Sequence, residues 1–152
     1  MNETGFYVAK LWHEILMSSS TEEYVKKYPE LMDCSPLEIQ IIVITGTSSN
    51  LLLRDYVSAL HIPKSTLTSA VKRLEKQKYI KRTICEQDLR SYSLVLDEKG
   101  IVFLEKYLAY QNDMGNQIIN GLDENEKKQL IALLKKIPSY MLGDNYYENT
   151  QK

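Results

Sequence analysis

The sequence predicts a mainly α-helical chain with one small β-hairpin, and three observations support this fold class. Apolar residues recur at the three- and four-residue spacing of amphipathic helices through most of the chain. Two of these helical segments are separated by only three residues, and two β-prone runs follow them. With 43% hydrophobic residues, 26% charged residues and 6 Gly in 152 residues, the composition excludes a disordered or collagen-like chain.

The first segment, over residues 6–16, has an apolar stripe at helical spacing. Its members are Val8, Leu11, Trp12, Ile15 and Leu16. A polar run over residues 18–21 breaks this stripe, and a short helix over 21–28 is expected to stop before Pro29. The segment lacks the basic start and unbroken apolar run of a signal peptide.

The next helix has a clear start signal in Ser35-Pro36-Leu37-Glu38. This run combines an N-cap serine, a proline at the first helical position and a glutamate three residues after the cap. The apolar run over residues 39–44 is therefore expected to be helical, and Gly46 with the polar residues 47–50 is expected to end the helix.

Two short amphipathic helices follow, joined by His61-Ile62-Pro63. Their apolar positions are Leu53, Tyr56, Val57 and Leu60 in the first and Leu67, Ala70, Val71 and Leu74 in the second. Strand-like runs at 79–85 and 91–96 then predict a hairpin with a polar tip, and two helices after Asp97 and Asp123 complete the chain. The whole pattern predicts a winged helix-turn-helix domain flanked by N- and C-terminal helices.

The net charge of −1 would by itself argue against nucleic acid, but the charge is unevenly distributed. Residues 61–82 contain seven basic side chains and one acidic side chain, for a net charge of +6, so the rest of the chain has a net charge of −7. The basic stretch coincides with the second helix of the helix-turn-helix. Its outward face and flanks hold small hydroxyls and cations suited to DNA: Ser65, Thr66, Thr68, Ser69, Lys72, Arg73 and Lys76. The alternative is an ordinary solvated face.

Three stretches resemble the MarR family of winged helix-turn-helix transcriptional regulators. Residues 62–76 are similar to the family's recognition helix, which ends in Leu-Glu, and Asp88-Leu89-Arg90 resembles its Asp-x-Arg wing signature. Residues 96–100, Leu-Asp-Glu-Lys-Gly, are similar to the opening of the family's next helix. The resemblance covers about residues 51–104. One departure is Lys78, at a position where the family often has glycine.

The resemblance implies a single domain over residues 1–152, with the winged-helix part at about 35–96 and dimerisation helices at about 3–18 and 97–142. It implies a homodimer on a palindromic DNA site, with each recognition helix in a major groove. Asp88 and Arg90 would act at the wing, where Arg90 enters the minor groove.

Other sites are less distinctive. The resemblance implies an effector site for a small aromatic or other molecule near Tyr7, Trp12 and His13, although tyrosines also serve in cores and interfaces. Cys34 and Cys85 are either redox sensors or structural thiols. No spacing indicates a metal site, a cofactor or a catalytic site, and no window is apolar enough for a membrane span.

The sequence thus predicts a cytoplasmic, sequence-specific binder of double-stranded DNA. It would act as a homodimeric repressor released by a small molecule or a stress signal. Two alternatives remain open: a winged helix that binds a partner protein instead of DNA, and a redox or metal sensor on the same fold. Enzyme activity is not expected.

Overall fold

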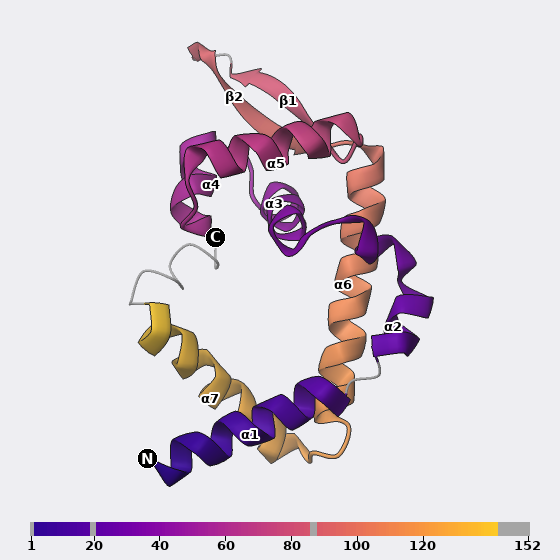
Figure 1. The fold of residues 1–152 in the computed structure, drawn as a ribbon, viewed down its shortest axis with the longest axis vertical. Helices are drawn as coiled ribbons and strands as arrows, with labels where there is room; N and C mark the ends of the chain where they lie inside the picture. The colour runs from indigo at the N-terminus through magenta and orange to yellow at the C-terminus, as the bar shows by residue number, and fades with distance from the viewer. Residues whose placement is uncertain (1, 19–20, 86–87, 143–152) are drawn as a thin grey trace. The chain divides into compact units, whose positions relative to one another are not determined.

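The computed structural model describes residues 2–18, 21–85 and 88–142. Two compact units divide the chain, one up to Gln111 and one from Asn112. The elements are shown in Figure 1 and have these bounds: α1 Glu3–Ser18, α2 Thr21–Lys27, the 3₁₀ helix η1 Pro29–Asp33, α3 Pro36–Thr47, α4 Leu53–Leu60, α5 Lys64–Lys76, β1 Ile80–Cys85, β2 Asp88–Leu96, α6 Glu98–Ile119 and α7 Glu124–Leu142. The predicted order of helices and hairpin is confirmed.

Helix α3 begins with the predicted capping box. The Ser35 N–H donates to Glu38 Oε2 at 2.8 Å, and the Glu38 N–H donates to Ser35 Oγ at 3.4 Å. Gly46 lies within the last turn, one residue before the helix ends. A Cβ at this position would collide with the Leu104 side chain and crowd that of Leu96. Glycine therefore also permits the close approach of these two side chains to α3.

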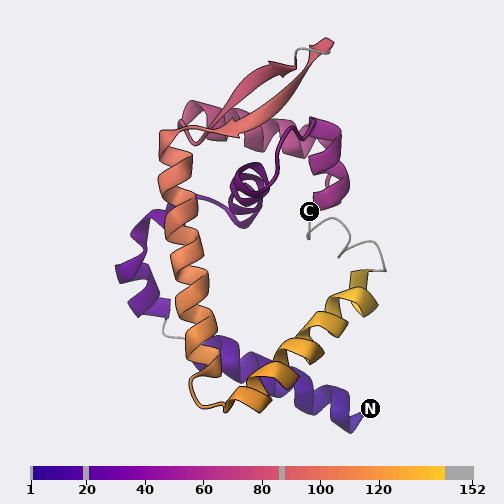
Figure 2. The same cartoon turned by 180° about the vertical axis from the view of Figure 1, so that it is seen from behind.

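The core of the first unit lies among α3, α4, α5, the hairpin and the start of α6. Helix α3 contacts α5 and β2, while α5 contacts α4 and β1. Figures 1 and 2 show the same arrangement from opposite sides, with α3 beneath α5. The largest fully buried side chains are Tyr56, Tyr79, Phe103, Ile41, Ile42, Leu67, Leu74, Ile80 and Val71. This packing fixes α5 on the body of the domain.

The hairpin pairs β1 with β2 in antiparallel register, from Ile80 opposite Leu96 to Ile84 opposite Tyr92. The second strand begins at Asp88, three residues before its predicted start. A bridge between Leu52 and Ser93 adds a further point of pairing, which the sequence did not predict. The wing is therefore joined at its base to the residue that precedes α4.

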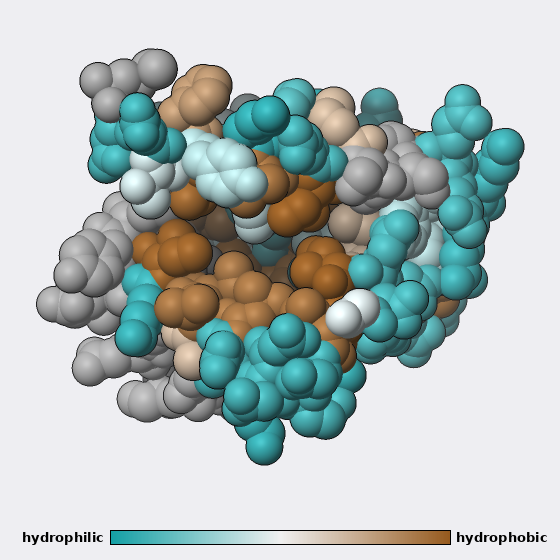
Figure 3. Space-filling view, turned by 90° about the horizontal axis from the view of Figure 1, so that it is seen from below, coloured by the Kyte–Doolittle hydropathy of each residue, from teal (hydrophilic) through white to brown (hydrophobic). Residues whose placement is uncertain are grey.

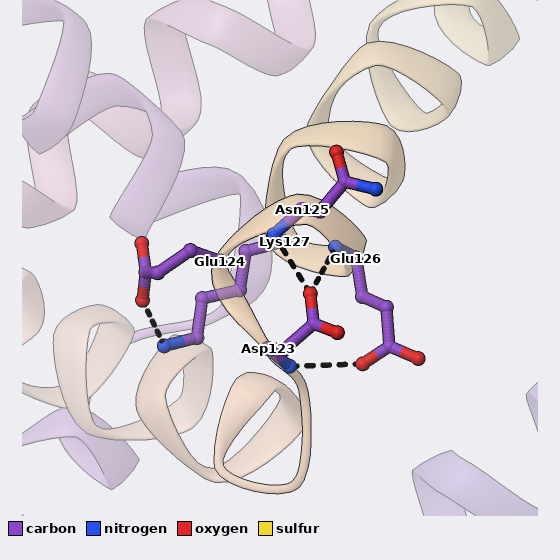
Figure 4. A network of polar contacts seen from close by, with 5 residues as sticks. All are labelled: Asp123, Glu124, Asn125, Glu126 and Lys127. Atoms are coloured by element: carbon purple, nitrogen blue, oxygen red, sulfur yellow. Dashed lines mark hydrogen bonds and ion pairs between the residues drawn. The ribbon is translucent and has the colours of Figure 1, made fainter.

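In the second unit, Asp123 caps α7 as predicted, as Figure 4 shows. Asp123 Oδ1 accepts from the N–H groups of Asn125 at 2.8 Å and Glu126 at 2.9 Å, and Glu126 Oε2 accepts from the Asp123 N–H at 2.8 Å. Such a reciprocal box satisfies N–H groups that the first helical turn leaves open. Across the described ranges, the helices are too short or too polar to span a lipid bilayer.

Candidate nucleic-acid interface

Helix α5 has the two faces that the sequence predicts. Its apolar positions are fully buried, with exposed fractions of 0% for Leu67, 3% for Ala70, 0% for Val71 and 0% for Leu74. Most polar positions on the opposite side of the helix and at its edges are exposed, namely Ser65, Thr66, Ser69, Lys72, Arg73 and Lys76. Thr68 is partly buried. One face thus anchors the helix while the other faces solvent.

The turn before α5 leaves the start of that helix accessible. His61 ends α4 in the left-handed conformation, with φ of 50°, which reverses the chain within a few residues. Pro63 precedes α5 and provides no side-chain cap for its first N–H groups. Open N–H groups at a helix start attract anions, and DNA phosphate is one such anion.

The hydroxyls on α5 are held in defined orientations. Thr68 Oγ1 donates to the Lys64 carbonyl at 2.8 Å, and Ser69 Oγ donates to the Ser65 carbonyl at 3.0 Å. Because each proton is directed back into the helix, the oxygen lone pairs remain available as acceptors. In this state, these two groups suit the amino donors that adenine and cytosine present in the major groove.

The cations of the basic stretch fall into two groups. Lys72 and Lys76 are exposed, and neither forms an ion pair within the part of the chain that the structure describes. By contrast, Arg73 Nη2 lies 2.9 Å from Glu38 Oε1, and Arg82 Nε lies 2.8 Å from Glu75 Oε1. Lys81 Nζ also lies 3.9 Å from Asp97 Oδ1, so three of the basic charges in residues 61–82 are paired with carboxylates of the same chain.

The predicted wing residues Asp88 and Arg90 belong to β2 by their backbone, but their side chains lie outside the described part of the structure. At the base of the wing, the Arg82 guanidinium lies 4.3 Å from the centre of the Tyr92 ring. Lys78 adopts φ of 63°, a left-handed conformation that glycine adopts without steric strain.

The three predicted effector residues all lie on α1 and are exposed. Tyr7 is 59% exposed and Trp12 is 56% exposed, and His13 is also open to solvent. At about 100° per residue, the three side chains leave the helix in different directions, so a single chain does not bring them together.

Sequence reasoning missed an aromatic cluster that joins α2 to α6. The Tyr110 ring lies edge-on to Tyr24 at 5.3 Å and to Tyr28 at 5.9 Å, and Tyr107 follows at 6.2 Å. Burial raises the pKa of Tyr107. The four-residue spacing of Tyr24 and Tyr28 and the three-residue spacing of Tyr107 and Tyr110 were the available signals, because such pairs share a helix face.

The environment of Cys34 favours a structural thiol over a reactive one. The side chain is 8% exposed, and burial raises the pKa of the thiol, which disfavours the reactive thiolate. The Cys85 side chain lies outside the described residues. Among the residues that the structure does describe, there is no cluster of His, Cys, Asp and Glu that would hold a metal ion.

Comparison with known proteins finds a family match for part of the chain. Residues 35–92 match the model of the MarR family. The HTH-type transcriptional regulator PecS of Dickeya dadantii is 31% identical over 88 residues, which are 58% of this chain and 53% of PecS. The transcriptional repressor MprA of Escherichia coli K12 is 33% identical over 81 residues, 53% of this chain and 46% of MprA. The chain thus spans about half the length of these curated relatives.

Solved structures show the same fold over a larger part of the chain. FabT of Streptococcus pneumoniae, solved in complex with DNA, superposes with a TM-score of 0.70 at 24% identity and covers 88% of this chain and 96% of its own. At this level of identity, the likeness establishes the fold. The part of the chain that matches the MarR family, residues 35–92, holds helices α3, α4 and α5 and most of the hairpin.

Proposed function

We propose that the protein is a homodimeric regulator that binds double-stranded DNA at a pseudo-palindromic operator and represses transcription until a small-molecule or stress signal releases it. The observation that carries this proposal is the arrangement of apolar and polar side chains on α5. Its apolar face is fully buried, and its other face presents hydroxyls and the lysines Lys72 and Lys76 to solvent. A major-groove reading helix requires this combination of anchoring and exposed polar groups.

The relatives support a DNA partner. FabT, which shares the fold, was solved in complex with DNA, and MprA is named a transcriptional repressor. In this chain, lysines on α5 would add affinity by releasing counterions from phosphates, while the hydroxyls near its start would contact bases or phosphates. At the wing, Arg90 would enter the minor groove, with Asp88 holding it in place.

The terminal helices support the homodimer. Helix α1 exposes Phe6, Tyr7, Val8, Leu11, Trp12, Ile15, Leu16 and Met17 by 40–69% each. Helix α7 exposes Ile131, Leu133, Leu134 and Ile137 by 41–59%. Figure 3 shows a view of the molecule in which hydrophobic side chains, in brown, are open to solvent. A soluble chain rarely leaves this much apolar surface uncovered, and a second copy would cover it.

A signal site would use the same helices. Tyr7, Trp12 and His13 are exposed on α1, so a small aromatic effector would require a second surface to enclose it. Contact with a partner copy would supply such a surface. Binding to a bacterial chromosome would place the protein in the cytoplasm.

The test is the salt dependence of DNA binding. The probe is a duplex enriched from randomised DNA by the wild-type protein. Wild type should bind it at about 50–100 mM salt with affinity that falls steeply as salt rises. Lys72→Ala should flatten the slope of log affinity against log salt by about one unit, because one phosphate contact is lost. Lys106→Ala removes the same charge from an exposed position of α6. It is the matched control and should leave the slope unchanged.

Two outcomes contradict the proposal. The first is that no duplex is enriched and none is retained by the protein at about 50–100 mM salt. The second is that the affinity for DNA does not depend on the salt concentration. The first outcome, with a folded dimer, would favour a winged helix that binds a partner protein. A comparison of Arg90→Ala on duplexes with narrow and with wide minor grooves tests the wing, because the loss should be greater for the narrow grooves.

A further inference from the structure

We propose that Glu38 is a positioning residue that fixes the reading helix α5 through Arg73, and that Arg73 therefore serves orientation and not phosphate binding. The inference rests on the proposed DNA binding and assigns part of the basic stretch a different role. A helical wheel places Arg73 at the edge of the exposed face, beside the cations that are directed at DNA. The structure gives its guanidinium a partner on α3 instead.

The Glu38 carboxylate is buried, and both of its oxygens have partners. Glu38 is 5% exposed. Its Oε2 accepts from the backbone N–H of Ser35 at 2.8 Å and from Ser35 Oγ at 2.7 Å, so the first turn of α3 holds it in place. Its Oε1 lies 2.9 Å from Arg73 Nη2. A cation on α5 thus binds a carboxylate whose position is fixed by α3.

The two partners of this ion pair differ in burial, so losing the pair costs Glu38 more than Arg73. The Glu38 side chain is 6% exposed and that of Arg73 is 62% exposed. A buried carboxylate without a cation is strongly unfavourable, whereas the exposed Arg73 side chain pays little desolvation to stay beside it. A DNA phosphate would have to remove Arg73 from Glu38 and leave that carboxylate uncompensated. The pair is therefore expected to persist in the DNA complex.

A second ion pair joins α5 to β1, the first strand of the wing. Glu75 Oε1 on α5 lies 2.8 Å from Arg82 Nε on β1, and the Arg82 guanidinium lies over the ring of Tyr92 on β2. Residues two positions apart thus attach α5 to α3 and to the wing. Because base readout depends on the angle at which α5 enters the groove, a small rotation about its axis would misplace the hydroxyls.

The decisive variant is Glu38→Gln. A glutamine at this position retains the capping box, since its amide oxygen still accepts from the Ser35 N–H, but it removes the charge that holds Arg73. Affinity for the enriched duplex should fall about five- to tenfold. Affinity for a scrambled duplex and the salt slope on both duplexes should match wild type, because the DNA-facing charges are unchanged. A loss of specific binding alone is the signature of a misplaced reading helix.

The competing assignment, in which Arg73 contacts a DNA phosphate, predicts the opposite change in the DNA affinity of Glu38→Gln. If Arg73 contacts phosphate, Glu38→Gln releases it from its carboxylate and should raise both affinity and salt slope. Either that result or wild-type affinity for the enriched duplex would overturn the inference. Thermal unfolding and the active fraction from stoichiometric titration are measured alongside, so that a loss through misfolding is separated from a loss of specificity.

A double-mutant cycle completes the experiment. Arg73→Met should lower specific affinity without changing the salt slope, and the double variant Glu38→Gln/Arg73→Met should be no weaker than Arg73→Met alone. A fall of about one unit in the slope for Arg73→Met, as expected for Lys72→Ala, would show a phosphate contact and overturn the inference. Failure of wild type to bind any duplex would instead overturn the proposed function itself.

Discussion

Helices α5 and α1 have the same apolar spacing in the sequence and opposite surroundings in the structure. The apolar positions of α5 are 0–3% exposed, because α3, α4 and β1 pack around them. On α1, Val8, Leu11, Trp12, Ile15 and Leu16 are 40–61% exposed. An amphipathic pattern therefore shows that a helix face needs to be covered, but not whether the same chain or a second copy covers it.

The difference separates two kinds of residue in this protein. Those on the buried face of α5 determine the stability of one chain, whereas those on α1 are available for assembly. If the proposed dimer is correct, changes to the two faces should affect different measurements.

The largest effect is expected for Leu11→Glu on α1. A charge in the middle of the exposed apolar stripe should dissociate the dimer, so the mass from light scattering should fall from twice to once the 17.6 kDa of the chain. Loss of the second reading helix should weaken operator binding by about 10²- to 10⁴-fold. Lys10→Glu, one position away on the same helix, is the control and should remain dimeric. A dimeric Leu11→Glu variant would contradict the proposed interface.

On the other side of the comparison, Leu67→Ala should destabilise the single chain. The side chain is 0% exposed, so its truncation leaves a cavity and should lower the free energy of unfolding by about 2–5 kcal/mol. Urea titration measures this effect. The variant should remain dimeric under conditions in which it is folded. Dissociation of the dimer without a loss of stability would contradict the assignment of the α5 face to single-chain stability and of α1 to assembly.

Tyr79→Phe tests a polar group within the same core. Its hydroxyl is buried without a hydrogen-bond partner in the described chain, and burial, with neighbouring Cys34 and Asp33 adding to the effect, raises the pKa of Tyr79. The folded state therefore favours the neutral phenol. The stability that this supports is fully present below pH about 10 and is lost as pH rises above that value.

The phenylalanine variant should accordingly lose less stability than wild type in alkaline denaturation. At neutral pH, its unfolding free energy should be unchanged or higher by up to about 1 kcal/mol, because no hydrogen bond is removed. Thermal unfolding from pH 7 to about pH 11 measures both effects. A large loss of stability at pH 7 would show that the hydroxyl has a partner.

The smallest effect is expected for Lys78→Gly, between α5 and the wing. Lys78 has φ of 63°, a conformation that glycine adopts without steric strain. The substitution should raise the free energy of unfolding by about 0.5–1 kcal/mol and leave the dimer unchanged. A decrease in thermal stability would show that the lysine side chain stabilises the turn in other ways.

Local signals explain why much of the fold was predictable. The cap at Ser35, the buried face of α5 and the cap at Asp123 each depend on residues within one or two helical turns, and all are confirmed. The single bridge between Leu52 and Ser93 has no comparable signal, because an isolated pairing needs no run of strand-forming residues.

The candidate site was predictable in composition but not in its internal pairing. A helical wheel gives the direction of a side chain and not its partner, so Arg73 and Arg82 were indistinguishable from Lys72 as basic residues. Their carboxylate partners differ in kind. Glu75 is seven positions from Arg82, while Glu38 belongs to another helix that only folding brings near.

The most direct test of the central claim is a hydroxyl-radical footprint of the wild-type protein on its enriched duplex. Two reading helices related by a dimer axis should give two equal protected patches whose centres are about 10 bp apart, one helical turn of DNA. A single protected patch would contradict the dimer, and the absence of protection would contradict DNA recognition by α5.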